Sequence, residues 1–181
     1  APPPDPKWPG GARVAISFVL NYEEGGERSI LHGDKTSEVF LHEVVGLAPR
    51  QGMRDEQVES VYEYGSRAGF WRILRLFKDR GLHFTSYAVA MALERHPEAA
   101  RAMVEAGHEI ASHGWRWIDY AGMGIAEERR HMKLAIAALT RVTGERPVGW
   151  YTGRLSANTR KLVVEIGRAT RLNSSHGYIS Y

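Results

Sequence analysis

An apolar run that ends in two adjacent acids constrains this chain more than any other stretch of its sequence. The run covers residues 14–20, and Asn-Tyr-Glu-Glu-Gly-Gly follows it directly at residues 21–26. Near-continuous apolarity over this length is typical of a strand that is buried on both faces, as in a parallel sheet. In α/β folds the chemistry is concentrated at the carboxyl ends of such strands. The run therefore predicts a buried strand that presents Glu23 and Glu24 at a functional edge of a sheet.

Helical and strand patterns alternate along the rest of the chain. Apolar residues at three- to four-residue spacing predict helices over 66–81, 97–107, 127–144 and 156–167. Ser66 and Ser156 are the expected N-caps of the first and last of these helices. Shorter apolar runs predict strands over 84–90, 108–112 and 148–151. The polar stretch 23–58 should form a long functional loop, which suits a lid or a subunit contact.

The alternation predicts an α/β fold with a parallel sheet. A closed (β/α) barrel takes about eight strands and about 250 residues, and the 181 residues here supply roughly half of these units. The pattern is compatible with a small open sheet or with the N-terminal part of a barrel. Residues 168–181 differ in composition from everything before them. We therefore expect one incomplete domain over 1–167 and a divergent, non-native tail over 168–181.

Composition narrows the function classes. The 24 Lys and Arg residues exceed the 21 Asp and Glu residues by only three, which gives no support to nucleic-acid binding. The chain has no cysteine, so it has neither a disulfide framework nor a thiolate metal site. No apolar stretch approaches the roughly 20 residues of a membrane span. These features predict a cytoplasmic protein that binds neither nucleic acid nor membrane.

Polar residues follow three of the predicted strands and would meet at one edge of the sheet. Glu23 and Glu24 follow the first strand, His113 follows the strand over 108–112, and Tyr151 and Arg154 end the last one. A carboxylate can take a proton from water, an imidazole can protonate a leaving nitrogen, and an arginine can stabilise a developing oxyanion. Each residue alone is also compatible with a structural role, so the prediction of a hydrolytic site rests on their convergence.

Several motifs of the chain resemble the polysaccharide deacetylases, also called the NodB-homology superfamily. Residues 20–25 (Leu-Asn-Tyr-Glu-Glu-Gly) are similar to the first motif of that family, Thr-Phe-Asp-Asp-Gly, and residues 112–117 are similar to its second motif, His-Ser/Thr-x-x-His. The stretches 8–15, 21–28, 62–71 and 149–154 resemble one branch in particular, the cofactor-independent allantoinases. This resemblance implies a distorted parallel (β/α) barrel, present here as its N-terminal part. It also implies hydrolysis of the hydantoin ring of allantoin to allantoate in purine catabolism, by a protein that is a homo-oligomer at full length.

The resemblance assigns roles position by position. Glu23 stands at the general-base position, while Glu24 and His113 stand at two of three metal-ligand positions, and the third is Trp117. We therefore expect Glu23, Glu24 and His113 to be catalytic, Tyr22, Trp117, Tyr151 and Arg154 to bind substrate, and no metal or other cofactor to take part. Two other interpretations stay open: a metal-dependent N-deacetylase of polysaccharide or peptidoglycan, and an inactive fragment or binding module.

Overall fold

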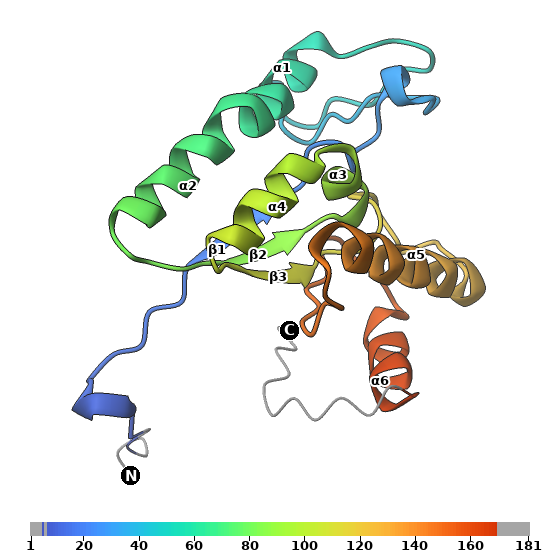
Figure 1. Ribbon diagram of the computed structural model, residues 1–181. Coiled ribbons are helices and arrows are strands. Elements are labelled where there is room, and N and C mark those ends of the chain that lie inside the picture. Colours follow the sequence, from blue (N-terminus) through green and yellow to red (C-terminus); the bar gives the residue numbers. More distant parts are fainter. Residues whose placement is uncertain (1–4, 6, 170–181) are drawn as a thin grey trace.

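The computed structural model describes residue 5 and residues 7–169, and Figure 1 shows how its elements are arranged. The three strands are β1 (Val19–Tyr22), β2 (Thr85–Ala88) and β3 (Glu109–Ser112). The helices are α1 (Glu56–Tyr64), α2 (Phe70–Asp79), α3 (Ala90–Arg95), α4 (Pro97–Glu105), α5 (Ile125–Thr143) and α6 (Thr159–Ala169). Shorter turns are η1 (Pro9–Gly11), η2 (Ile30–His32) and the π-helical η3 (Gly65–Gly69). No helix in this described part is long and apolar enough to cross a membrane.

The three strands form one parallel sheet in the order β1-β2-β3. Its register aligns Tyr22, Ala88 and Ser112, so residues 23 and 113 leave the sheet at the same edge. The predicted α/β class with a parallel sheet is confirmed. The sheet explains how residues that lie 90 positions apart in the sequence come to share one site.

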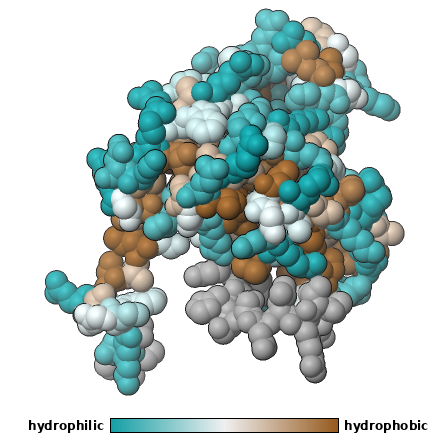
Figure 2. Space-filling model, in the orientation of Figure 1, coloured by the Kyte–Doolittle hydropathy of each residue, from teal (hydrophilic) through white to brown (hydrophobic). Residues whose placement is uncertain are grey.

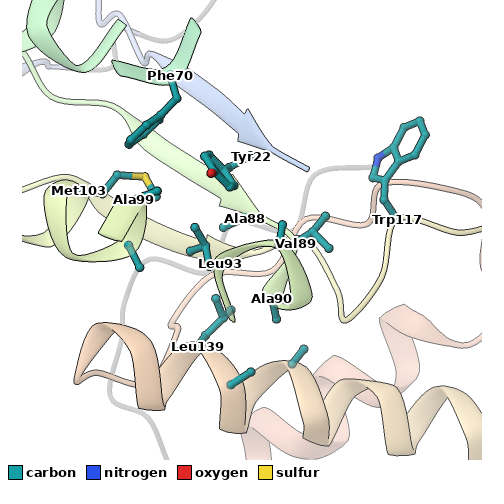
Figure 3. Packing of buried hydrophobic residues seen from close by; sticks show 14 of the residues in the cluster. Tyr22, Phe70, Ala88, Val89, Ala90, Leu93, Ala99, Met103, Trp117 and Leu139 are labelled. Carbon is teal, nitrogen blue, oxygen red and sulfur yellow. The ribbon is translucent and has the colours of Figure 1, made fainter. Parts of the chain in front are cut away.

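Helices cover one face of this sheet and form the core there. Tyr22, Ala88 and Ile110 point to this face, where they meet Phe70 of α2, Leu93 of α3, Met103 of α4 and Leu139 of α5, among other residues. Figure 3 shows Tyr22 beside Phe70 within this cluster and Trp117 at its far end. Because side chains alternate along a strand, Asn21 and Tyr87 project from the opposite face. Both residues contact the site: Asn21 bonds to Glu23, and the Tyr87 ring lies next to that of His113.

The first strand is shorter and more exposed than its sequence predicts. β1 begins at Val19, and residues 14–18 form no strand, although they belong to the predicted one. Val14 and Ile16 are 67% and 72% exposed, and hydrophobic residues accordingly gather along the extended N-terminal segment in Figure 2. The expectation of burial on both faces is wrong for this strand, because the described helices cover only the face that carries Leu20 and Tyr22, while Val19 and Asn21 are exposed. Apolarity alone does not tell whether one face of a strand is covered or both.

The helix predicted from Ser66 begins ten residues earlier. Asp55 is its N-cap, and its carboxylate accepts the Val58 N–H at 3.1 Å. Ser66 is not an N-cap: it lies inside the π-helical turn that joins α1 to α2, and its N–H donates to Glu24. The capping signal at Asp55 is present in the sequence, but few apolar residues follow it and the helical period is weak there.

Three other elements differ from the prediction. The segment around Trp150 forms one parallel bridge to Ser112 in place of a fourth strand. The short helix α3 follows β2 directly and was not predicted, because its apolar residues continue the pattern of the strand. The last helix runs past Gly167 to Ala169, and the remainder of the predicted tail, 170–181, lies outside the described residues. The division at residue 167 stays a prediction. Helices α4 and α5 and the long loop before α1 lie where the sequence predicts them.

His108 should make the stability of the fold depend on pH. This residue is 7% exposed, its ring stacks on Phe84, and its Nδ1 accepts the Phe84 N–H at 3.2 Å. Burial, aided by His83, lowers the pKa of His108 below its usual 6.5. As the pH falls, the unfolded chain therefore binds a proton at this histidine before the folded chain does. The contribution of the neutral His108 side chain to the free energy of unfolding is complete above pH 6.5 and is lost as the pH falls through the lower pKa of the folded state. In urea unfolding at pH 7.5 and pH 5.0, the His108→Leu variant should lose less stability on acidification than the wild type does. Equal losses would contradict the role of His108.

Candidate functional site

Glu23 and His113 form the centre of the candidate site. The Glu23 Oε1 atom lies 3.2 Å from the His113 Nε2 atom, and the Asn21 amide donates to the same oxygen at 3.1 Å. The imidazole is 1% exposed, whereas the Glu23 side chain is 21% exposed. The carboxylate therefore faces solvent, where it can meet water or substrate, and the histidine stands behind it. This is the pairing that the sequence predicts for a hydrolytic site.

The second nitrogen of His113 fixes the orientation of the ring. The Nδ1 atom lies 2.8 Å from the backbone carbonyl oxygen of Tyr151. A carbonyl oxygen only accepts hydrogen bonds, so Nδ1 carries a proton and donates it. The Nε2 atom then faces the Glu23 carboxyl group, with 3.2 Å between Nε2 and Oε1. The Tyr151 carbonyl and the Glu23 carboxyl group thus hold the ring at both of its nitrogens.

Arg154 lies beside this pair in an aromatic and acidic surrounding. Its guanidinium carbon stands 3.8 Å from the centre of a Trp117 ring and 5.3 Å from the centre of the Phe40 ring. Its Nη2 atom also forms an ion pair with Glu38 at 3.2 Å. Stacking on a tryptophan face and pairing with a carboxylate both stabilise a cation. These contacts hold the Arg154 guanidinium in place against Trp117.

Tyr151 and Arg154 line an open groove. The groove has a volume of about 630 Å³, and Phe40 and Asp119 also line it. The Tyr151 ring stacks on that of Tyr87 with 4.4 Å between their centres. A groove of this size with aromatic walls and a few polar groups suits a small-molecule ligand.

Two of the predicted site residues lie elsewhere. Glu24 turns away from Glu23, and its Oε2 accepts the N–H of Ser66 at 2.8 Å. Burial raises the pKa of the Glu24 carboxyl, although the Ser66 hydrogen bond works against this. Tyr22 packs against Phe70 in the core, and its hydroxyl has no hydrogen-bond partner within the described part of the chain. The structure therefore brings Glu23, His113, Trp117, Tyr151 and Arg154 together, and separates Glu24 and Tyr22 from them.

Sequence reasoning also missed residues that the structure places in the site. Glu38 and Phe40 come from the long loop, where nothing but the length of the loop indicated a function. Gly153 lies against His113: an added Cβ would meet the ring atoms Cε1 and Nε2 at 2.9 Å. A glycine just before the predicted arginine was the available signal for this close approach.

Comparison with known proteins places the chain in a family. The model of the family described as polysaccharide deacetylase matches residues 50–170, which is more than half of the chain. The chain belongs to the polysaccharide deacetylase family. A Schizosaccharomyces pombe protein described as a polysaccharide deacetylase is 47% identical over 163 residues, which are 88% of this chain and 51% of that protein.

Two solved structures share the fold of this family member. The crystal structure of PuuE allantoinase is 65% identical, with a TM-score of 0.86, and the match covers 91% of this chain and 55% of that one. A Pseudomonas aeruginosa PAO1 protein described as a polysaccharide deacetylase is 64% identical, with the same TM-score and the same coverage. The chain therefore spans about half the length of the relatives that it matches.

The site does not fit the metal that the deacetylase motifs imply. A catalytic zinc usually takes three protein ligands. Of the three corresponding positions, His113 binds Glu23, Glu24 turns to Ser66, and Trp117 has no lone pair in its ring plane to donate. A guanidinium also covers a ring of Trp117. Among the described residues, no group of three His, Cys, Asp or Glu side chains is arranged to hold a metal ion.

Proposed function

We propose that this protein is a hydrolase that opens the hydantoin ring of allantoin, or of a related cyclic ureide, to give allantoate. The contact between Glu23 and His113 carries the proposal, because it joins an exposed carboxylate to a buried, oriented imidazole. Arg154 supports it, since a fixed guanidinium suits the oxygens of a ureide. The 65% identity to the structure of PuuE allantoinase supports the same substrate class.

In the proposed reaction, water attacks a ring carbonyl of the substrate. Glu23 takes a proton from the water as its oxygen bonds to the carbonyl carbon, and Arg154 faces the negative charge that develops on the carbonyl oxygen. The carbon–nitrogen bond then breaks, and the leaving ring nitrogen takes this proton from Glu23, because the His113 ring is only 1% exposed and lies behind the carboxylate. His113 Nε2, 3.2 Å from Glu23 Oε1, orients the carboxylate for both proton transfers.

The activity should be independent of metal. We expect a chain of the relatives' full length to keep its rate within about twofold in a strong chelator, because two ligands hold zinc too weakly. Trp117→His would place a metal-binding residue type at the third ligand position. Added zinc should nevertheless not raise the rate of allantoin hydrolysis by this variant. Elemental analysis together with activity measurements tests this. Stoichiometric zinc, with activity lost on chelation and restored by zinc, would overturn the metal-free proposal.

A second candidate function is N-deacetylation of polysaccharide or peptidoglycan. The observation that favours it is the 64% identity to the Pseudomonas aeruginosa protein described as a polysaccharide deacetylase. Allantoin and an N-acetylglucosamine oligomer, each offered to the full-length chain, distinguish the two. Release of allantoate alone supports the first function, and release of acetate alone supports the second. If neither allantoate nor acetate is released, the result favours a non-catalytic protein.

We further propose a cytoplasmic, homo-oligomeric enzyme of purine catabolism. Phe40, Leu41 and Val44 are more than two-fifths exposed, and Val45 is 97% exposed. Such an apolar cluster on a surface loop is typical of a protein contact. The oligomeric state of the full-length chain, measured by light scattering, would test this part of the proposal.

A further inference from the structure

The segment 150–158 carries much of the site without being part of a helix or a strand. It provides the Tyr151 carbonyl, which orients His113, and it provides Gly153 and Arg154. Its beginning is tied to β3, because the Tyr151 N–H donates to the Ser112 carbonyl at 2.8 Å. The position of the rest depends on how its far end is held.

Glu128, on α5, lies at the centre of the network that holds this far end. Its Oε1 accepts the Ser156 hydroxyl at 2.6 Å and also accepts the Thr159 hydroxyl. The Ser156 oxygen in turn accepts the N–H groups of Asn158 and Thr159, each at 3.0 Å. Two further bonds join the segment to the preceding loop: Tyr120 N–H to the Leu155 carbonyl, and the Asn158 amide to the Met123 carbonyl. Glu128 provides the only charge in this set of contacts, and bonds to a charged group are the stronger ones.

A purely structural role does not explain Glu128, because its burial lowers the stability of the fold. The residue is 2% exposed, and its Oε2 has no hydrogen-bond partner among the described residues. Burying an unsatisfied carboxylate oxygen destabilises a fold. Glu128 also lines a small cavity that His113, Gly153 and Arg154 line as well. This cavity, about 20 Å³, has room for a single water molecule. The carboxylate and the catalytic histidine thus share one cavity.

We propose that Glu128 is a positioning residue for the reaction. It holds Ser156 and Thr159 so that the Tyr151 carbonyl stays on His113 Nδ1 and Arg154 stays on Trp117. Glu128 contacts no substrate and acts through this segment alone. The kinetic part of the inference rests on the proposed function, whereas the orientation of His113 does not depend on any activity.

The kinetic test compares Glu128→Ala with Glu127→Ala in the full-length chain. Glu127 is the adjacent residue on α5, and its exposed side chain pairs with Arg130 and with His131. We expect Glu128→Ala to lower kcat at least about tenfold and to raise KM at least about threefold, because small displacements of catalytic and binding groups are costly. Glu127→Ala should leave both constants near their wild-type values. A variant that only reduced the folded fraction would lower the apparent kcat and leave KM unchanged, which would overturn the proposal.

A spectroscopic test works without any substrate. In ¹⁵N NMR at neutral pH, the wild-type His113 should show a protonated Nδ1, and Glu128→Ala should show a mixture of ring states because the Tyr151 carbonyl moves. Glu128→Gln keeps the shape of the side chain and should shift the His113 signals in the same direction by a smaller amount. This variant keeps the test valid if Glu128→Ala does not fold. Unchanged His113 signals in Glu128→Gln and in a folded Glu128→Ala would refute the positioning role. If the His113 signals change in the variants but the wild-type protein does not hydrolyse allantoin, the positioning role of Glu128 is supported and the proposed function is rejected.

Discussion

Glu23→Gln should lower kcat by about two to four orders of magnitude and leave KM nearly unchanged, since a general base acts in the transition state. Glutamine keeps the size of the side chain and can still accept from Asn21, but it cannot take a proton from water. It also removes the charge that faces His113 Nε2 at 3.2 Å. Steady-state kinetics of allantoin hydrolysis by the full-length chain measures both constants.

Glu24→Gln is the matched control for this prediction. The two glutamates are adjacent in the sequence, but Glu24 bonds to Ser66 at the junction of α1 and α2. We expect its replacement to change kcat far less than Glu23→Gln does. If Glu24→Gln abolished turnover and Glu23→Gln spared it, the base would be Glu24, and the proton transfer by Glu23 would be wrong.

The fold was largely predictable because its apolar pattern and its glycines are regular. Gly107 and Gly144 end α4 and α5 with positive φ angles, as their positions after two helical patterns predict. The extent of β1 was not predictable, since the exposure of Val14 and Ile16 depends on the partners of the strand and not on the run itself. Helix α1 was missed because tertiary contacts, including the bond between Ser66 and Glu24, stabilise a segment with a weak pattern of its own.

The candidate site was predictable where it follows strand ends and not where it depends on loops. Glu23 and His113 meet because the register of a parallel sheet places residues 23 and 113 at one edge. The alternation of side chains along β1 turns Tyr22 into the core, and a sharp turn sends Glu24 to another partner than Glu23. Glu38 reaches Arg154 from across the long loop, and no periodicity encodes that contact.

Gly153→Ala should lower kcat at least about a hundredfold, because it displaces the groups that this segment positions. A Cβ at this position would lie 2.9 Å from both Cε1 and Nε2 of His113 and 3.4 Å from Nε1 of Trp117. The ring cannot yield easily, since Tyr151 and Glu23 hold its two nitrogens. The φ angle of Gly153 is not positive, so the backbone itself tolerates alanine and the effect is steric.

Gly122→Ala is the control for this effect, because Gly122 also has no positive φ angle and no atom stands within 4 Å of its added Cβ. It should leave kcat and the thermal midpoint near their wild-type values. Gly153→Ala should keep the thermal midpoint within a few degrees and lose turnover, since the segment can shift outward at its open groove. Full turnover in a folded Gly153→Ala protein would show that the segment moves without moving His113, and the close packing of Gly153 would then have no part in the reaction.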